Sequence, residues 1–486
     1  MSVHTLSDPA VTPQPQQSQP GLNPDASQRA HLMERVYAFA DEYLESIPTQ
    51  KAYIDRPDRG IGLYDSPIDE NGIGLEPTLD LIRDHVTSVG LNPTSGRFLG
   101  YIPGGGIFYS ALGDFLAAVT NRYSGVFFAS PGAVRMESLL IRWMSDLIGY
   151  PESSAGYLAS GGSVANQSAI VAARDHCEIE GAEIPRSVVY MTAHVHHCVD
   201  KALKMAGLRK CIVRRIPADD RHRMNVSALD QAVRDDRASG VRPWLVVSSA
   251  GTTNTGSVDP LNEIADVAER EGLWNHIDAA YGGFFILCPE GREILEGMGR
   301  SDSIVMDPHK TLFLPYGTGA LLVKDRERLL ASTHVGADYM QDTLRDTDEL
   351  SPSDLSPELT KHFRSLRLWL PLKVLGLTPF RAALSEKIQL ARYFHKQLAM
   401  IDGFEVGPEP DLSVVTFRYV PKTGDADEFN QRLVREIHRD GRVFMSTTQV
   451  DGRFTLRMAA ICFRTHKNDI DLALEVLQEV VTRIKD

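Results

Sequence analysis

Short apolar segments alternate with helix-like segments from about residue 95 to 375, and this alternation constrains the fold more than any other feature. Apolar runs rich in valine and leucine, such as 188–191 and 244–248, are separated by segments with helical periodicity, such as 261–271. Strands joined through helices pair in parallel, and the helices cover both faces of the sheet. The pattern predicts an α/β fold with a mainly parallel sheet and a ligand site at the carboxyl ends of its strands.

Changes in composition divide the 486 residues into segments. The first segment is rich in Pro, Gln and Ser and lacks large apolar residues, so we expect it to be disordered. A long acidic and polar stretch inside the large domain is expected to be a mobile, functional loop. The predicted segments are a tail (1–24), an N-terminal helical segment (25–94), a large domain (95–375) that contains the loop (334–360), and a small C-terminal α+β domain (376–486).

The first predicted helix has Asn23 as its cap and Pro24 as its first residue. A helix with an apolar face near a chain end needs a partner surface, either the body of the chain or another subunit. The apolar residues that repeat at helical spacing are Leu32, Val36, Phe39, Ala40, Tyr43, Leu44 and Ile47.

Charge and motif content exclude several classes of protein. A net charge of −13 disfavours a nucleic-acid surface, and no run approaches the ~20 apolar residues of a membrane helix. The five cysteines show no Cys-x-x-Cys spacing, which favours the reducing cytoplasm over a disulfide framework or a zinc site. The N-terminus lacks the pattern of a secretory signal. Nucleotide, zinc-protease and serine-hydrolase motifs are absent, and Gly104-Gly105-Gly106 lacks dinucleotide-binding spacing.

A lysine and an aspartate follow two of the predicted strands. Lys310 ends the tetrapeptide Asp307-Pro308-His309-Lys310, and Asp278 lies in a strand-like segment about thirty residues earlier. Pyridoxal 5'-phosphate (PLP) needs an amine to hold its aldehyde and a carboxylate to keep its ring nitrogen protonated. Considered alone, each residue could equally occupy an ordinary turn. Together they favour a PLP site.

Small residues at other predicted strand ends and helix starts suit the remainder of the cofactor. Gly162 and Ser163 open a predicted helix, whose N-terminus can bind a phosphate, although a plain glycine turn with a serine cap is the alternative. Ala280 shares a strand face with Asp278 and leaves room for a flat ring. Thr253 ends another strand and offers a hydroxyl group, as would any strand-terminating turn.

Three histidines, His194, His196 and His197, follow one predicted strand. A metal site is disfavoured because no matching Glu, Asp or Cys ligand set stands nearby. A histidine that stacks on the cofactor ring is the more economical interpretation, and His196 is the candidate. An ordinary loop histidine is the alternative.

These residues resemble the group II PLP-dependent amino-acid decarboxylases, a family that includes the aromatic L-amino-acid decarboxylases. The resemblance covers about residues 30–480 and implies a fold type I PLP enzyme, an obligate homodimer with sites at the subunit interface. It also implies that the N-terminal helices wrap the partner. The matching segments are His276 to Tyr281, Asp307 to Lys310, Ala129-Ser130-Pro131, Gly251-Thr252-Thr253, His362 to Trp369, Leu456-Arg457 and Ile461 to Thr465.

The resemblance implies a role for each matching residue. Lys310 would hold PLP covalently, Asp278 would pair with the ring nitrogen, and His196 would stack on the ring with Ala280 against its other face. Several relatives have asparagine at Asp307, and a carboxylate beside a phosphate is repulsive unless a cation intervenes. The other implied cofactor contacts are Gly162, Ser163, Thr253, Asp307 and His309.

Tyr339, in the predicted loop, distinguishes two reactions within the family. In the decarboxylases the matching tyrosine protonates the α-carbon after carbon dioxide leaves, whereas the related aldehyde synthases usually carry phenylalanine there. The tyrosine favours simple decarboxylation, with Lys310, Tyr339, His196 and Asp278 as catalytic residues.

The expected substrate is an aromatic L-amino acid. Tyr101 and Pro103 lie in Tyr101-Ile102-Pro103-Gly104, where aromatic-specific members often carry Tyr-Phe-Pro-Thr, and nearby aromatic residues favour an apolar side chain. We predict PLP-dependent decarboxylation to the amine and carbon dioxide in a cytoplasmic homodimer. The alternatives are a decarboxylase of Glu, Asp or His, an aromatic aldehyde synthase, a fold type I aminotransferase, and a PLP-binding scaffold without catalysis. The nearby aromatic residues are Tyr123, Phe127 and Phe128.

Overall fold

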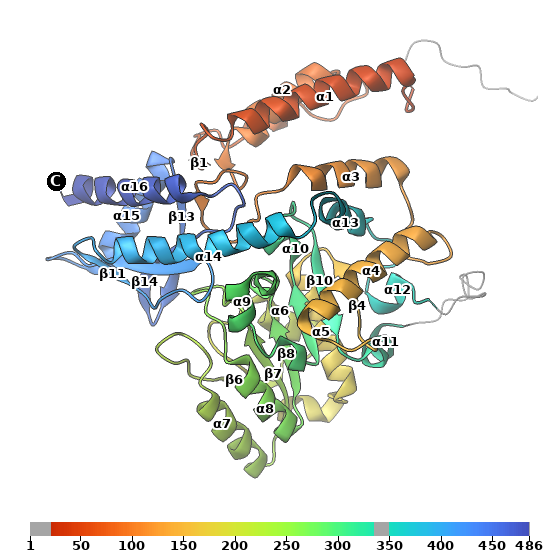
Figure 1. Ribbon diagram of the computed structural model, residues 1–486, viewed down its shortest axis with the longest axis vertical. Helices are drawn as coiled ribbons and strands as arrows, with labels where there is room; N and C mark the ends of the chain where they lie inside the picture. The colour runs from red at the N-terminus through yellow and green to blue at the C-terminus, as the bar shows by residue number, and fades with distance from the viewer. Residues whose placement is uncertain (1–20, 335–348, 486) are drawn as a thin grey trace, which may run out of the picture. The chain divides into compact units, whose positions relative to one another are not determined.

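The structure is a computed structural model that describes residues 21–334 and 349–485 (Figure 1). The chain divides into two compact units. One runs from the N-terminus to Thr49 and resumes over Asp58–Ser88, and the other holds Gln50–Pro57 and Val89–Asp486. Among the described residues, no helix combines the length and the apolar character needed to cross a membrane.

The smaller unit is helical, and its first helix starts at a different residue from the one predicted. Asp25, not Asn23, is the cap, so the prediction that Pro24 is the first helical residue is also wrong. The Asp25 carboxylate accepts the Gln28 N–H at 2.8 Å, and the Asp25 N–H donates to Gln28 Oε1 at 2.9 Å. These two reciprocal hydrogen bonds satisfy two backbone N–H donors at the start of the helix, and Asn23 takes part in neither bond. The elements are α1 (Ala26–Ser46), a 3₁₀ helix (Ile61–Asp65), α2 (Leu75–Ile82) and a π-helical turn (Arg83–Thr87).

Seven strands of the described chain form a single sheet in the larger unit. Their order is β4-β10-β9-β8-β7-β5-β6; β10 runs antiparallel to both neighbours and the other pairs are parallel. The mainly parallel α/β sheet predicted from the sequence is confirmed. The strands are β4 (Ala155–Ala159), β5 (Ser187–Met191), β6 (Ile212–Arg215), β7 (Arg242–Ser249), β8 (Trp274–Asp278), β9 (Ser303–Met306) and β10 (Gly319–Val323).

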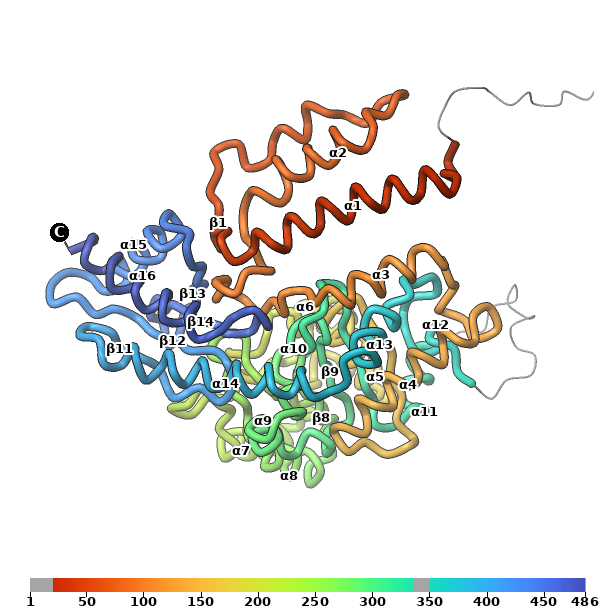
Figure 2. The backbone as a smooth tube through the Cα atoms, turned by 45° about the horizontal axis from the view of Figure 1, so that its top comes forward, coloured from red at the N-terminus to blue at the C-terminus, as the bar shows by residue number. Residues whose placement is uncertain are grey.

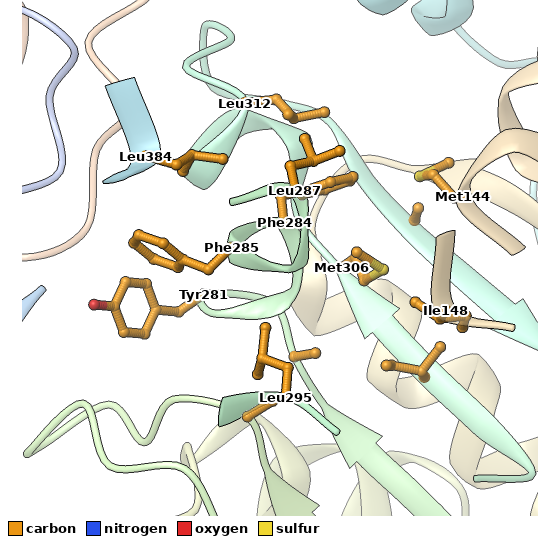
Figure 3. Packing of buried hydrophobic residues seen from close by; sticks show 14 of the residues in the cluster. Met144, Ile148, Tyr281, Phe284, Phe285, Leu287, Leu295, Met306, Leu312 and Leu384 are labelled. Atoms are coloured by element: carbon orange, nitrogen blue, oxygen red, sulfur yellow. The ribbon is translucent and has the colours of Figure 1, made fainter. Parts of the chain in front are cut away.

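Helices cover both faces of this sheet. Successive side chains of β9 point to opposite faces, so Ile304 and Met306 join one core layer while Val305 joins the other. Figure 3 shows the first layer, where Met306 packs with side chains of α4 and of the 3₁₀ helix Gly283–Leu287. Helices α5, α6 and α11 cover the opposite face. The helices of the larger unit that pack on the large sheet or link it to the rest of the unit are α3 (Phe108–Thr120), α4 (Pro131–Ile148), α5 (Gly162–His176), α6 (Cys198–Met205), α7 (Val226–Ala238), α8 (Leu261–Glu271), α9 (Pro289–Ile294), α10 (Pro308–Thr311), α11 (Arg326–Thr333), α12 (Pro352–Leu355), α13 (Arg364–Leu375) and α14 (Thr378–Leu398), together with short 3₁₀ helices (Gly181–Arg186 and Met298–Arg300).

Five described strands form a second sheet, in the order β11-β12-β14-β13-β3. Figure 2 shows the C-terminal strands β11, β12, β13 and β14 in blue, gathered with α15 and α16 beside the large sheet. The last helix, α16, buries Ile470, Leu477 and Ile484 in the core of this sheet. The elements are β3 (Phe98–Leu99), β11 (Phe404–Val406), β12 (Val414–Tyr419), α15 (Ala426–Asp440), β13 (Phe444–Val450), β14 (Arg453–Ala459) and α16 (Lys467–Lys485), with a separate two-stranded ribbon of β1 (Tyr53–Ile54) and β2 (Gly90–Leu91).

Several elements differ from the sequence pattern. β4 was not expected, because Ala-Gly-Tyr-Leu-Ala carries little strand preference. Its pairing with β10 creates the strand, and Gly156 is required there because a Cβ would collide with the carbonyl oxygen of Leu321. β3 lies far from the other strands of its sheet in sequence and pairs in parallel with β13. Part of the predicted loop 334–360 is helical, since α12 begins with a capping box formed by Ser351 and Asp354.

A buried ion pair links α4 to the segment before α13. Lys361 Nζ lies 2.7 Å from Glu137 Oε1, and both side chains are almost fully buried. The same Glu137 oxygen accepts the Leu158 N–H of β4 at 3.0 Å. The pair therefore supports the strand that leads into the loop at residues 160–163.

We expect Lys361→Met to lower the free energy of unfolding by about 3–5 kcal/mol, because the Glu137 charge stays buried without its partner. Urea denaturation measures this change. The double variant Lys361→Met/Glu137→Gln removes both charges and keeps an acceptor for Leu158, so it is expected to recover most of the loss. Equal losses in the single and double variants would contradict this assignment.

Candidate active site

The carboxyl ends of β4, β5, β7, β8 and β9 surround a cavity of about 330 Å³. Parallel strands bring their carboxyl ends to one edge, so residues far apart in sequence meet there. Every cofactor-binding residue predicted from the sequence lines this cavity: Gly162, Ser163, His196, Thr253, Asp278, Ala280, Asp307, His309 and Lys310.

Lys310 lies on α10, the single helical turn that follows β9. Its Nζ lies 3.0 Å from Asp307 Oδ2. Burial alone would lower the pKa of Lys310, but the carboxylates of Asp307 and Asp278 more than offset burial, and the pKa is raised above its ordinary value. The Lys310 amine is therefore held as an ammonium ion.

Asp307 is 1% exposed and lies between Lys310 and the start of α5. Its Oδ2 accepts a hydrogen bond from the Gly162 N–H at 3.2 Å, and the same oxygen forms the ion pair with Lys310. A Cβ at Gly162 would lie 2.8 Å from that oxygen, so glycine is needed for the close approach. The ammonium of Lys310 is the cation that compensates the Asp307 charge in this corner of the cavity.

Asp278 ends β8 and is 8% exposed. Its Oδ1 accepts the Ala280 N–H at 3.1 Å, and its Oδ2 accepts a hydrogen bond from Asn166 Nδ2 at 3.4 Å. Within residues 21–334 and 349–485, Asp278 forms no ion pair with a cationic side chain. A buried carboxylate without a cationic partner is costly, which fits a site that receives a protonated ring nitrogen.

The His196 ring lines the cavity with a defined orientation. Its Nδ1 accepts the Cys198 N–H at 3.2 Å, so the neutral ring carries its proton on Nε2. Burial lowers the pKa of His196, which keeps the ring neutral. His194 and His197 do not line the cavity, and His194 packs edge-on against His222. No group of three or more His, Cys, Asp or Glu side chains with metal-binding geometry occurs in the described parts of the chain.

His309 and Thr253 complete the predicted set. His309 Nδ1 lies 2.6 Å from the carbonyl oxygen of Thr318, which can only accept, so Nδ1 carries the proton. Burial lowers the pKa of His309. Thr253 faces the cavity, whereas Thr252 binds Thr255 and belongs to a buried hydroxyl cluster.

Two predicted substrate residues lie away from this cavity. Tyr101 is 54% exposed, adopts a left-handed backbone conformation and contacts Phe444. Pro103 lines a second, apolar cavity of about 150 Å³ that shares His309 with the first. Tyr339, predicted to be the proton donor, lies outside the described residues.

Sequence reasoning missed several residues that line the cavity, and Asn166 is the most informative of them. It is fully buried on α5, among alanines. A lone amide on the buried, small-residue side of a helix is the signal that could have identified it. The other residues are Ser160, Gly161, Val164, Cys198, Ser249, Gly251 and Tyr281.

The donor set fits PLP. Lys310 offers an amine for the aldehyde, Asp278 a carboxylate for the ring nitrogen, and the N-terminus of α5 a positive helix end for the phosphate. His196 offers a flat ring for one face of the cofactor, and Ala280 offers a small side chain for the other face. The cavity can therefore hold an electron-withdrawing cofactor next to a substrate amine.

Comparison with known proteins agrees with this site. Residues 76–420 match the model of the pyridoxal-dependent decarboxylase conserved domain. The chain is 34% identical to the aromatic-L-amino-acid decarboxylase of Bacillus atrophaeus, over 85% of this chain and 86% of that protein. It is 30% identical to the phenylacetaldehyde synthase of Petunia hybrida, with 95% of each chain covered. The crystal structure of Oryza sativa TDC with PLP and tryptamine superposes with a TM-score of 0.89 at 26% identity, covering 96% of this chain and all of that chain.

We expect Asp307→Asn to speed the capture of PLP by the cofactor-free protein at neutral pH. Removal of the carboxylate lowers the pKa of Lys310, so more of the amine is neutral and reactive, and the pH profile of capture moves down by about one unit or more. Stopped-flow absorbance measures the rate. Asp302→Asn, at the far end of β9, is the matched control and should leave the profile unchanged. A profile that stays fixed or moves up in Asp307→Asn would contradict the assignment.

Proposed function

The chain belongs to the pyridoxal-dependent decarboxylase family, and from this premise we propose that it converts an aromatic L-amino acid to its amine and carbon dioxide. The observation that carries the proposal is the meeting of Lys310 and Asp278 in one cavity at the carboxyl edge of the large sheet. One group holds a carbonyl compound and the other keeps a ring nitrogen charged, and both are needed to make the cofactor electron-withdrawing.

The proposed roles follow from the surroundings of each side chain. When bound, PLP withdraws electrons from the substrate α-carbon. Lys310 would hold the cofactor through its amine, and Asp278 would keep the ring nitrogen protonated. His196 and Ala280 position the ring.

The remaining residues bind the phosphate end and deliver the proton. Gly162, Ser163, Thr253 and His309 are the proposed contacts to the phosphate and to the edge of the cofactor. Asp307 is proposed to position Lys310 rather than to bind the phosphate directly, because its carboxylate already pairs with that amine. Tyr339 is the proposed donor of a proton to the α-carbon, which determines that an amine is released.

The apolar cavity beside His309 supports an aromatic substrate. Its volume of about 150 Å³ resembles that of an engineered apolar cavity that accepts benzene. Pro103, from the predicted substrate wall, lines it together with Leu314, Pro315 and Tyr316. A cavity with these walls suits an apolar ring better than a carboxylate side chain. Tyr101 is proposed to border the entrance of this apolar cavity. The relatives named for aromatic amino acids support the same substrate class.

Exposed apolar side chains support a homodimer. On α3, Phe108, Leu112, Phe115 and Val119 are each at least 40% exposed, and no side chain of α1 is buried. Apolar rows of this kind commonly mark protein–protein contacts. Analytical ultracentrifugation tests the dimer, which a monomer at micromolar concentration would exclude. The five free thiols support a reducing location such as the cytoplasm, which cell fractionation tests.

A panel of L-amino acids (Phe, Tyr, Trp, DOPA, His, Glu and Asp) tests the reaction, with amine, carbon dioxide, aldehyde, hydrogen peroxide and keto acid all measured. We expect amine and carbon dioxide from aromatic substrates only, with no turnover in Lys310→Ala. In Tyr339→Phe we expect less amine and more aldehyde, ammonia and hydrogen peroxide. Without the proton donor, dissolved O2 can oxidise the α-carbon and is itself reduced to hydrogen peroxide. Aldehyde as the wild-type product would identify an aldehyde synthase, and a keto acid would identify an aminotransferase.

A further inference from the structure

A row of buried polar side chains extends from Asp278 into the protein interior. Asn166 lies beside Asp278, His276 beside Asn166, and Ser303 beside His276, with the Trp274 indole at the far end. All four are at most 2% exposed. Buried polar groups in an otherwise apolar sheet are costly unless each finds a partner, so their connection is a feature to be explained.

The hydrogen-bond direction at Asn166 is determined by its neighbours. Its Nδ2 lies 2.9 Å from the Gly162 carbonyl oxygen and 3.4 Å from Asp278 Oδ2. A carbonyl and a carboxylate can only accept, so the amide nitrogen must face them. The amide oxygen then faces His276 Nε2 at 2.8 Å, and that nitrogen must donate.

The direction continues through His276. Burial lowers the pKa of His276 to about 4, so the ring is neutral and has a single proton, which is on Nε2. Its Nδ1 therefore accepts from the Ser303 hydroxyl at 2.8 Å. The Ser303 oxygen in turn accepts the Trp274 indole N–H, which can only donate, at 2.9 Å.

Every hydrogen bond in the row therefore points the same way, from Trp274 through Ser303, His276 and Asn166 to the Asp278 carboxylate. We propose that Asn166 and His276 are positioning residues that keep the Asp278 carboxylate aimed into the cavity, so that it can pair with the protonated ring nitrogen of PLP. The inference rests on the proposed role of Asp278 and adds the residues through which the fold supports that role. Aligned donors strengthen one another at low dielectric, and their positive ends all face the carboxylate.

The register of β8 and β9 supplies the geometry. His276 is paired with Ser303 across the parallel strands, and Asp278 lies two residues further along β8, on the same face. Asn166 reaches both from α5, one helical turn after Gly162. The row thus connects the group that faces the ring nitrogen to the helix whose N-terminus faces the phosphate.

The test compares two cofactors that differ only at the ring nitrogen. Full-length protein freed of cofactor is titrated with PLP and with 1-deaza-PLP, in which a C–H replaces that nitrogen, and the two dissociation constants are measured by absorbance. We expect Asn166→Ala to weaken PLP binding about tenfold, the size of a lost hydrogen bond to a charged group, and to leave 1-deaza-PLP binding unchanged. His276→Leu should act in the same direction, whereas His276→Gln, which can keep an N–H toward Asn166, should stay within about twofold of the wild type.

Ser168→Ala is the matched control. Ser168 lies on the same helix, is 6% exposed and loses a buried 2.7 Å hydrogen bond to Tyr157, but it does not reach Asp278. It should not change the ratio of the two dissociation constants. Circular dichroism checks that each variant folds, and the two His276 variants test the row independently of Asn166.

The possible outcomes separate this proposal from the proposed role of Asp278. A wild type that prefers PLP over 1-deaza-PLP, together with Asn166→Ala and His276→Leu variants that keep the same ratio, would overturn the positioning row alone. Equal weakening of both cofactors in those variants would also overturn it, because it indicates a general structural role. A wild type that binds the two cofactors equally would overturn the Asp278 pairing and the row together.

Discussion

The parallel pairing of β8 with β9 is the constraint on which the site depends. This register places Asp278 and the segment that carries Lys310 at one edge of the sheet, although thirty-odd residues separate them. A slip by one residue would turn Asp278 to the other face of the sheet. The register is held by residues that pack in both core layers, such as Ile304 and Val305. The same packing that forms the hydrophobic core of the large sheet therefore also fixes the positions of Asp278 and Lys310.

Charge balance is the second organising feature. Two buried carboxylates and one half-buried amine share the cavity, and the surroundings of each group differ. Asp307 pairs directly with Lys310 and with a backbone N–H, whereas Asp278 receives only neutral donors. Hydrogen bonds from neutral donors orient a carboxylate, but they leave its negative charge without a cationic partner. The cavity therefore retains one carboxylate able to pair with a cation, and this asymmetry distinguishes the two aspartates more clearly than their positions in the sequence do.

Histidines near the cavity are neutral for a shared physical reason. Burial lowers the pKa values of His196, His276 and His309, and in each ring a hydrogen bond fixes which nitrogen carries the proton. Neutral rings can lie against a cofactor or donate a hydrogen bond without adding a charge that would compete with the ring nitrogen for Asp278. This edge of the sheet thus combines the Asp307–Lys310 ion pair with neutral histidines and with Asp278, which forms no ion pair among the described residues.

The sequence by itself determined the alternating α/β architecture and some of the residues that gather at the cavity, because strand and helix periodicity and the end of each strand are local properties. Lys310, Asp278 and His196 could be named for that reason. Tertiary structure alone decided what depends on distant contacts. Gly156 and its neighbours form β4 only by pairing with β10. Asn166 became a candidate only when α5 packed against β8, since an amide on a helix has no preferred partner until folding supplies one.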